Sequence, residues 1–219
     1  MMDVFTARAT IAGHAQTLPA EIIPLAQARG RILAADTAAR VDVPPAANSA
    51  MDGYAFQIPD GPAPWRLPIS QTIAAGTAPQ PLQPNTAARI FTGGEIPPGA
   101  NTVAIQEDCE RDGNEVVIQV AVHVGENIRP RGQDLQRGQI IARKGEKLSA
   151  VHLGLLASCG VDSVTVQRRP RVALLSSGSE LIEPGQPLAP GQIYNSNLYL
   201  LGGLLQDWGC ELIRQECVA

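Results

Sequence analysis

Aromatic residues and an excess of basic charge are both missing from this sequence. It has three Phe, three Tyr and two Trp among 219 residues, so it offers few platforms on which the bases of a single-stranded nucleic acid could stack. Its formal net charge of −4 also disfavours contact with a phosphate backbone, which depends on clustered Lys and Arg. We therefore expect no nucleic-acid partner.

Long hydrophobic runs and paired cysteine motifs are absent as well. The longest apolar stretches, around 153–157 and 198–205, are far shorter than the ~20 residues of a membrane span. The first residues lack the basic and apolar regions of a signal peptide. The four cysteines have no CxxC spacing, which favours reduced thiols over disulfide or metal roles. These features predict a cytoplasmic protein with no membrane partner.

Glycine and proline, in contrast, are abundant. The 21 Gly and 18 Pro favour turns and short strands over a helical bundle. With 44% hydrophobic and 17% charged residues, the chain is too apolar to be disordered. Its length corresponds to one large domain or two small ones.

The sequence of the first two thirds of the chain predicts an N-terminal helix followed by a β module. A helix is expected from Asp3, as N-cap, to Leu18, and a short one at 25–28. The two prolines of VDVPPAAN (41–48) predict an extended linker. Five short strands follow, and a hairpin turn at 112–114 is expected to join the last two, which predicts a barrel or sandwich. These strands are expected at 53–58, 65–74, 88–91, 102–107 and 115–120.

The pattern changes after Leu135. A helix is expected from Ser149 to Ala157, closed by Gly160, and a strand at 161–166 follows it. The apolar strand 172–177, a helix at 197–208 and a strand at 210–217 predict one βαβ unit, in which the first strand is buried on both faces of a parallel sheet. Because two strands do not complete such a sheet, we expect a truncated chain or fragment.

Three polar segments of the β module are candidates for chemistry, and each has a structural alternative. Asp52 in NSAMDGY is either functional or part of an Asx turn. The glycines of FTGGEIPPG (91–99) either present amides to an anion or form a wide hairpin loop. In NIRPRGQD (127–134), the arginines and Asp134 either bind phosphate or a cation, or form a solvated salt bridge.

Two further segments lie in the predicted βαβ unit. SSGSEL (176–181) follows the first parallel strand, where α/β sheets bind ligands, but Ser177 and Glu180 also fit the capping box of a helix. Asn195 or Ser196 is a natural N-cap for the crossover helix, and the free amides behind it also suit an anion.

Taken together and in this order, these segments resemble the MoeA family of molybdopterin molybdenumtransferases, to which the gephyrin E domain is related. The resemblance runs from end to end of the chain but covers about the N-terminal half of a family member. One departure is Ala46-Ala47, where the family usually has a Phe-Asp or similar pair. The segments that carry the resemblance are VDVPPAANSAMDGYAF (41–56), RIFTGGEIPPGANTVAIQED (89–108), ENIRPRGQDLQRGQ (126–139), PRVALLSSGSEL (170–181) and GQIYNSNLYLLGGLL (191–205).

The resemblance implies a multi-domain fold that combines α+β and α/β domains. Residues 1–43 and 135–169 would form an elongated helical and stranded first domain, into which a β module, 44–134, is inserted. Residues 170–219 would begin a molybdopterin-binding α/β domain, which would be incomplete here. Family members are homodimers in which the β module reaches the active site of the partner subunit.

The resemblance also implies a reaction. The family inserts molybdate into adenylylated molybdopterin in a Mg²⁺-dependent reaction that releases AMP. Carried over by motif, Asp52 and Glu180 would be acidic groups near metal and phosphate, and Thr92 and Asp134 would help position substrate or molybdate. The residues that would line the region of the pterin phosphate are Ser177, Gly178, Ser179, Asn195 and Ser196.

Two other functions fit the same residues. One is a non-catalytic dimeric scaffold or pterin-binding module of the same lineage, which would bind without turnover. The other is a generic α/β anion-binding domain with a β insertion. Because the chain covers half of a family member, we expect it to be inactive or only partly active by itself.

Overall fold

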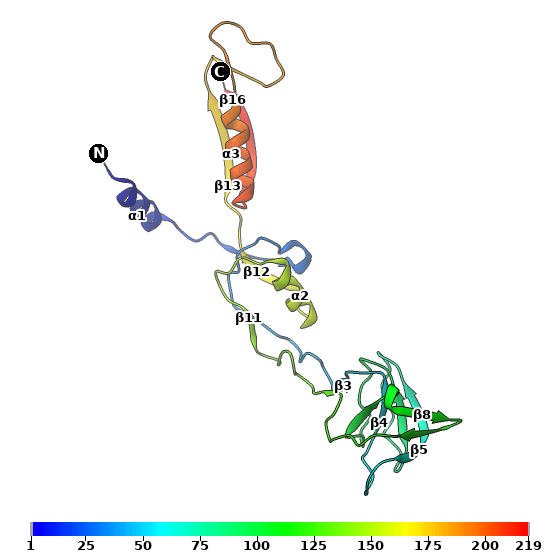
Figure 1. Cartoon of the computed structure of the whole chain (residues 1–219). Helices are drawn as coiled ribbons and strands as arrows, with labels where there is room; N and C mark the ends of the chain where they lie inside the picture. The colour runs from blue at the N-terminus through cyan, green and yellow to red at the C-terminus, as the bar shows by residue number, and fades with distance from the viewer. Residues whose placement is uncertain (1, 219) are drawn as a thin grey trace. The chain divides into compact units, whose positions relative to one another are not determined.

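The computed structural model describes residues 2–218, which form two compact units (Figure 1). Unit 1 takes residues 2–37, 140–157 and 161–218, and unit 2 takes residues 38–139 and 158–160. The expected domain boundaries near residues 43, 134 and 169 stay a prediction.

Unit 2 is built on one six-stranded sheet with the order β7-β4-β6-β5-β9-β8. The long β5 pairs with β9 through its first half and runs parallel to β6 through its second half, so the sheet curls along this strand. The five expected strands are confirmed to within two residues, in one curled sheet with β7 and β8 at its edges. The strands are β4 (Gly53–Phe56), β5 (Trp65–Ile73), β6 (Ala87–Ile90), β7 (Thr102–Ile105), β8 (Cys109–Asp112) and β9 (Glu115–Ile118).

The hairpin turn at 112–114 joins a different pair of strands from the one expected. It connects β8 to β9, with Asp112 opposite Glu115 and Gly113 at a φ of +59°. The expected pairing of 102–107 with 115–120 is therefore wrong. The sequence of β8, Cys-Glu-Arg-Asp, contains no apolar alternation, so periodicity did not reveal this strand.

Two hydrophobic clusters stabilise unit 2. One surrounds Phe56 and Trp65, whose ring centroids are 5.9 Å apart. The other contains Ile73, Ile90 and Val103. All four residues of β4 are buried, which fixes the strand that follows Asp52 in the middle of the sheet.

The segment 41–48 is extended, as expected, and pairs with the chain that leaves the β module. Val43 forms an antiparallel bridge with Leu135. Strand β3 (Asn48–Ser49) then pairs antiparallel with β10 (Ile128–Arg129). The prolines keep the segment extended, and extended backbone is the form that can pair.

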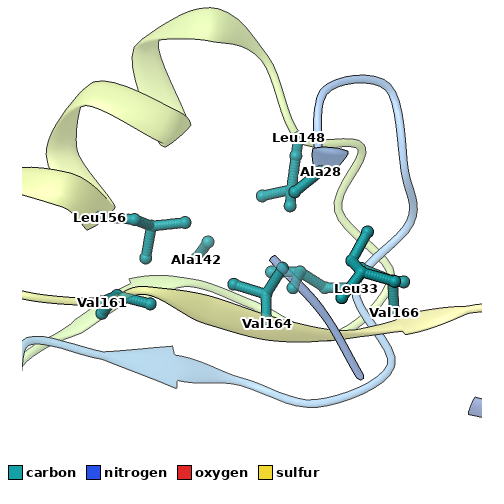
Figure 2. Packing of buried hydrophobic residues seen from close by; sticks show 9 residues of the cluster. Ala28, Leu33, Ala142, Leu148, Leu156, Val161, Val164 and Val166 are labelled. Carbon is teal, nitrogen blue, oxygen red and sulfur yellow. The ribbon is translucent and has the colours of Figure 1, made fainter. Parts of the chain in front are cut away.

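Unit 1 contains a second core. Strand β1 (Ala20–Pro24) pairs antiparallel with β12 (Ser163–Gln167), and α2 (Ala150–Ser158) packs above them. Figure 2 shows the packing, in which Leu156 of α2 points toward the sheet. The side chains labelled there are Ala28, Leu33, Ala142, Leu148, Leu156, Val161, Val164 and Val166. The helix and the strand expected at 149–166 are confirmed.

The remaining elements of the first part of the chain are short. Helix α1 (Val4–His14) begins as expected, because the Asp3 carboxylate accepts a hydrogen bond of 3.0 Å from the Thr6 amide. It ends before Leu18, which precedes a proline. The helix expected at 25–28 is a single 3₁₀ turn. The other short elements before β12 are η1 (Leu25–Gln27), β2 (Thr37–Ala38), η2 (Gln106–Asp108) and β11 (Ile140–Ala142).

The last part of the chain forms the expected βαβ unit. Strands β13 (Arg171–Ser177) and β16 (Glu211–Val218) are parallel and are connected through α3 (Ser196–Asp207). The expectation that β13 is buried on both faces is wrong: its residues alternate between exposed and half-buried, and Leu175 is 51% exposed. Within residues 2–218, β13 has one neighbouring strand and one covering helix, which leaves one of its faces open.

The connection between β13 and α3 contains a small parallel pair, β14 (Leu181–Ile182) and β15 (Ile193–Tyr194). This pair brings the turn after β13 next to the start of α3. Among the described residues, no helix is long and apolar enough to cross a bilayer.

Candidate functional site

Asp52 and Thr92 meet at one end of the curled sheet. Asp52 directly precedes β4, and Thr92 lies two residues after the end of β6. These strands are antiparallel neighbours, with Gly53 opposite Ile90, so the start of one lies beside the end of the other. The backbone amide and the hydroxyl of Thr92 both donate hydrogen bonds of 2.7 Å to Oδ1 of Asp52.

These contacts keep Asp52 ionised. The hydrogen bonds from the amide and hydroxyl of Thr92, together with the nearby charge of Arg89, lower the pKa of the Asp52 carboxyl below its usual value. Both bonds end on Oδ1, and none of the hydrogen bonds within residues 2–218 ends on Oδ2. The carboxylate is therefore held in one orientation with an oxygen that can bind a cation.

The Gly-Gly loop does not offer its amides to an anion. Gly93 donates its amide to the Ser49 carbonyl at 2.9 Å, and Gly94 donates to the Phe91 carbonyl at 2.8 Å. The glycines serve geometry instead: Gly93 has a φ of +79°, and a Cβ on Gly94 would lie 2.9 Å from the Phe91 carbonyl oxygen. The structural alternative, a wide hairpin loop, is also wrong, because β6 and β7 both pair with β4, which lies between them, and not with each other.

The segment 127–134 contains paired charges. Arg129 donates to Asp134 at 2.6 Å, and this carboxylate is half exposed. Asp134 thus contacts Arg129, and the structure does not bring it to Asp52 or Thr92. This geometry matches the structural alternative for the segment, a solvated salt bridge.

Asp42 is a structural carboxylate that sequence analysis missed. It accepts the Arg137 amide at 2.7 Å and pairs with Arg131, 89 positions later in the chain. These hydrogen bonds, the one from Arg137 first, lower the pKa of Asp42. No local pattern connects segments so far apart, so this pairing could not be predicted from the sequence.

A second group of expected residues gathers at the carboxyl end of β13, around a cavity of about 290 Å³. Asn195 is 2% exposed and donates to the Ser176 hydroxyl at 2.7 Å. Its side-chain oxygen accepts from the Leu198 amide, so it is the N-cap of α3, as expected. The expected residues that line the cavity are Ser177, Glu180, Asn195 and Ser196.

Glu180 folds back over the turn that precedes it. A Cβ on Gly178 would lie 2.6 Å from a carboxylate oxygen of Glu180, so the glycine makes room for this carboxylate. Ser179 is exposed in the same turn. No helix begins at Ser177, since residues 181–182 form β14. The capping-box alternative is therefore wrong.

The two expected metal-binding carboxylates lie in different units. Within residues 2–218, no group of three or more His, Cys, Asp and Glu side chains is placed to hold a metal ion. Asp52 belongs to unit 2 and Glu180 to unit 1. Each offers carboxylate oxygens, which are the ligands that Mg²⁺ prefers.

Comparison with known proteins identifies the family of this chain. The family model "MoeA N-terminal region (domain I and II)" matches residues 2–160. A molybdopterin molybdenumtransferase of Nostoc sp. is 41% identical over 199 residues, which cover 88% of this chain and 46% of that protein. Molybdopterin molybdenumtransferase 2 of Mycobacterium tuberculosis is 38% identical over 197 residues, which cover 87% of this chain and 49% of that protein.

A solved structure extends the comparison beyond the matched region. The molybdopterin biosynthesis MoeA protein of Pyrococcus horikoshii superposes with a TM-score of 0.85 at 32% identity, and the match covers 99% of this chain and 57% of that chain. The chain thus spans about half the length of the curated relatives it matches. Its fold is MoeA-like, and the chain belongs to the MoeA family.

Proposed function

We propose that this chain acts in molybdenum cofactor biosynthesis, as part of an enzyme that inserts molybdate into adenylylated molybdopterin and releases AMP. Membership of the MoeA family and the names of relatives at 38–41% identity support this function. The observation that carries it is the Asp52 carboxylate, fixed through Oδ1 by Thr92, while no hydrogen bond of the described residues ends on Oδ2.

The oxygen donors of the two sites fit Mg²⁺. Asp52 and Glu180 would hold the ion, which when bound would neutralise charge on phosphate oxygens. Asp52 supplies a carboxylate that is ionised at neutral pH and needs no rearrangement to bind a cation. Thr92 orients that carboxylate, and Asp134 restrains Arg129 in the same unit.

The cavity after β13 would bind the phosphate side of the pterin. Hydroxyl groups of Ser177 and Ser196 line it, and hydroxyls donate well to phosphate oxygens. The start of α3 adds backbone amides and the positive end of the helix dipole. Gly178 keeps the turn thin enough for Glu180 to lie over it, with Ser179 exposed beside them.

The assembly that we propose is a cytoplasmic homodimer. In this arrangement Asp52, Thr92 and Asp134 of one subunit serve the pterin cavity of the other.

The test measures AMP release from adenylylated molybdopterin in the presence of molybdate and Mg²⁺. It compares this chain with the same chain extended by the C-terminal half of a relative. We expect release from the extended chain and little or none from the 219 residues alone. Pterin binding without AMP release by either chain would refute the transferase and favour the non-catalytic pterin-binding module.

Asp52→Asn in the extended chain tests the carboxylate. We expect it to lower AMP release by about 100-fold or more, the effect of removing one electrostatic group from a reaction centre. Asp60→Asn is the matched control, because Asp60 is an exposed carboxylate elsewhere in unit 2. Full activity of Asp52→Asn would remove Asp52 from the mechanism.

A further inference from the structure

Arg89 contacts several residues next to the Asp52–Thr92 pair. Its guanidinium donates to the Gly53 carbonyl at 2.8 Å and to Oε1 of Gln106 at 2.7 Å. Gly53 directly follows Asp52 in the chain. Gln106 donates its own amide to the Asp52 carbonyl at 3.0 Å. Arg89 thus contacts both the residue that follows Asp52 and the residue whose backbone amide donates to the Asp52 carbonyl.

The same guanidinium lies between two aromatic rings. Its central carbon is 5.2 Å from the ring centroid of Tyr54 and 4.7 Å from that of Phe91. Phe91 directly precedes Thr92. A cation over an aromatic face is attracted by the ring quadrupole, so Arg89 also connects to the strand end that presents Thr92.

An ion pair does not account for the placement of Arg89. Among the ion pairs of residues 2–218, as far as the described side chains show, none includes Arg89. Other arginines of unit 2 contact carboxylates: Arg66 pairs with Asp112 and Glu115. The Arg89 guanidinium instead donates hydrogen bonds to a backbone carbonyl and a side-chain amide oxygen, and it lies over two aromatic rings. Lys cannot reproduce this combination.

We propose that Arg89 is a positioning residue that holds the start of β4 against the end of β6, and thereby holds the Asp52 carboxylate on Thr92. The proposal rests on the proposed function for its consequence in catalysis. Its structural part, the geometry of the Asp52–Thr92 pair, is measurable without the reaction.

The structural test is hydrogen exchange at the Thr92 amide, which Asp52 protects. In the 219-residue chain, Arg89→Met is expected to accelerate exchange at Thr92 by about tenfold while the amides of β5 and β9 keep their wild-type rates. Arg89→Lys keeps the charge and is expected to give an intermediate rate. The control Arg66→Met leaves Thr92 unchanged.

Two outcomes would overturn the proposal. One is an unchanged Thr92 rate in a folded Arg89→Met chain. The other is equal acceleration of every amide of unit 2, which would mean that Arg89 only stabilises the fold. If Arg89→Met proves too unstable to measure, Gln106→Leu removes one arm of the network and is expected to accelerate Thr92 exchange by a few-fold; an unchanged rate would count equally against the proposal.

The catalytic consequence is measured in the extended chain. Arg89→Met is expected to lower kcat for AMP release by about tenfold or more, with partial rescue by Arg89→Lys and a smaller change in KM. Loss of activity with an unchanged Thr92 exchange rate would overturn the positioning role. Absence of AMP release from the wild-type extended chain would refute the proposed function and leave the exchange test intact.

Discussion

Among the glycines of residues 2–218, Gly53 has the least room for a side chain, and Gly53→Ala therefore gives a sharp test of the fold. It lies in β4 between Ile90 of β6 and Ile105 of β7. A Cβ built on it would lie 2.0 Å from the Ala104 carbonyl oxygen and 2.9 Å from the Ala104 carbonyl carbon. Since unbonded heavy atoms prefer ~3.5 Å or more, β4 and β7 would have to separate by about 1 Å or more.

The expected cost follows from that separation. Forcing an extra methyl group into a packed site costs about 1–3 kcal/mol, and each weakened strand hydrogen bond adds about 1 kcal/mol. We expect Gly53→Ala to lower the free energy of unfolding of unit 2 by about 3 kcal/mol. For a unit of about 100 residues this corresponds to a fall in Tm of about 12 °C or more.

Tryptophan fluorescence can follow this transition selectively. Trp65 is 8% exposed in the core of unit 2, whereas Trp208 is 69% exposed in unit 1, so a Trp208→Phe background isolates the signal of Trp65. Gly154→Ala is the control, because a Cβ on Gly154 meets nothing within 4 Å, and it should leave the Trp65 transition in place. A Gly53→Ala midpoint equal to that of the parent would refute the close approach of β7 to β4.

Three further predictions concern other parts of the chain. The folded pKa of Asp42 lies below its ordinary value of 3.8, so its contribution to stability is present above that value and is lost as the pH falls through the lowered folded pKa. The free energy of unfolding should therefore fall less steeply with acid pH in Asp42→Asn than in the parent chain. An identical pH profile would contradict the Asp42 contacts. In α3, Gly203→Ala should stabilise the helix by up to ~1 kcal/mol, whereas Gly202→Ala should not, since its Cβ would lie 3.1 Å from the Gln215 side chain; equal effects in thermal melts by circular dichroism would contradict that packing. Phe56→Ala, at a fully buried side chain, should cost unit 2 about 3–5 kcal/mol in denaturant titration, and a loss below ~1 kcal/mol would place Phe56 outside the core.

The sequence predicted elements better than their partners. Strands β4, β5, β6, β7 and β9 combine apolar residues with Gly and Pro boundaries, and that local chemistry is enough to place them. The pairing of β9 with β8 was missed because the four residues of β8 are polar or half-buried. Strand partners depend on contacts across the whole unit, which no local window contains.

The candidate site shows the same division between local and distant information. The Asn195 N-cap was visible from the residues themselves, since it depends on contacts three residues apart. The meeting of Asp52 with Thr92 depends on the register of β4 against β6 over 40 positions. Local chemistry marked Asp52 as a candidate, whereas Thr92 was singled out only by the resemblance to a family. The role of the Gly93 amide stayed open in the sequence, because its acceptor, the Ser49 carbonyl, lies far earlier in the chain.

The two ends of unit 2 lie side by side, and this has a consequence for the history and the handling of the chain. The Ala39 amide donates to the Gln139 carbonyl, and the Gly138 amide donates to the Ala39 carbonyl, both at 2.9 Å. A segment whose ends lie close together can be inserted into another domain in a single step, because the host chain continues from nearly the same position after the insertion. Unit 2 can also be circularly permuted, because a short linker could join residues 38 and 139 and new termini could be placed at the exposed Gly113–Asn114 turn. Such a circular permutant would carry the Asp52–Thr92 pair in a chain of about 100 residues suited to spectroscopy.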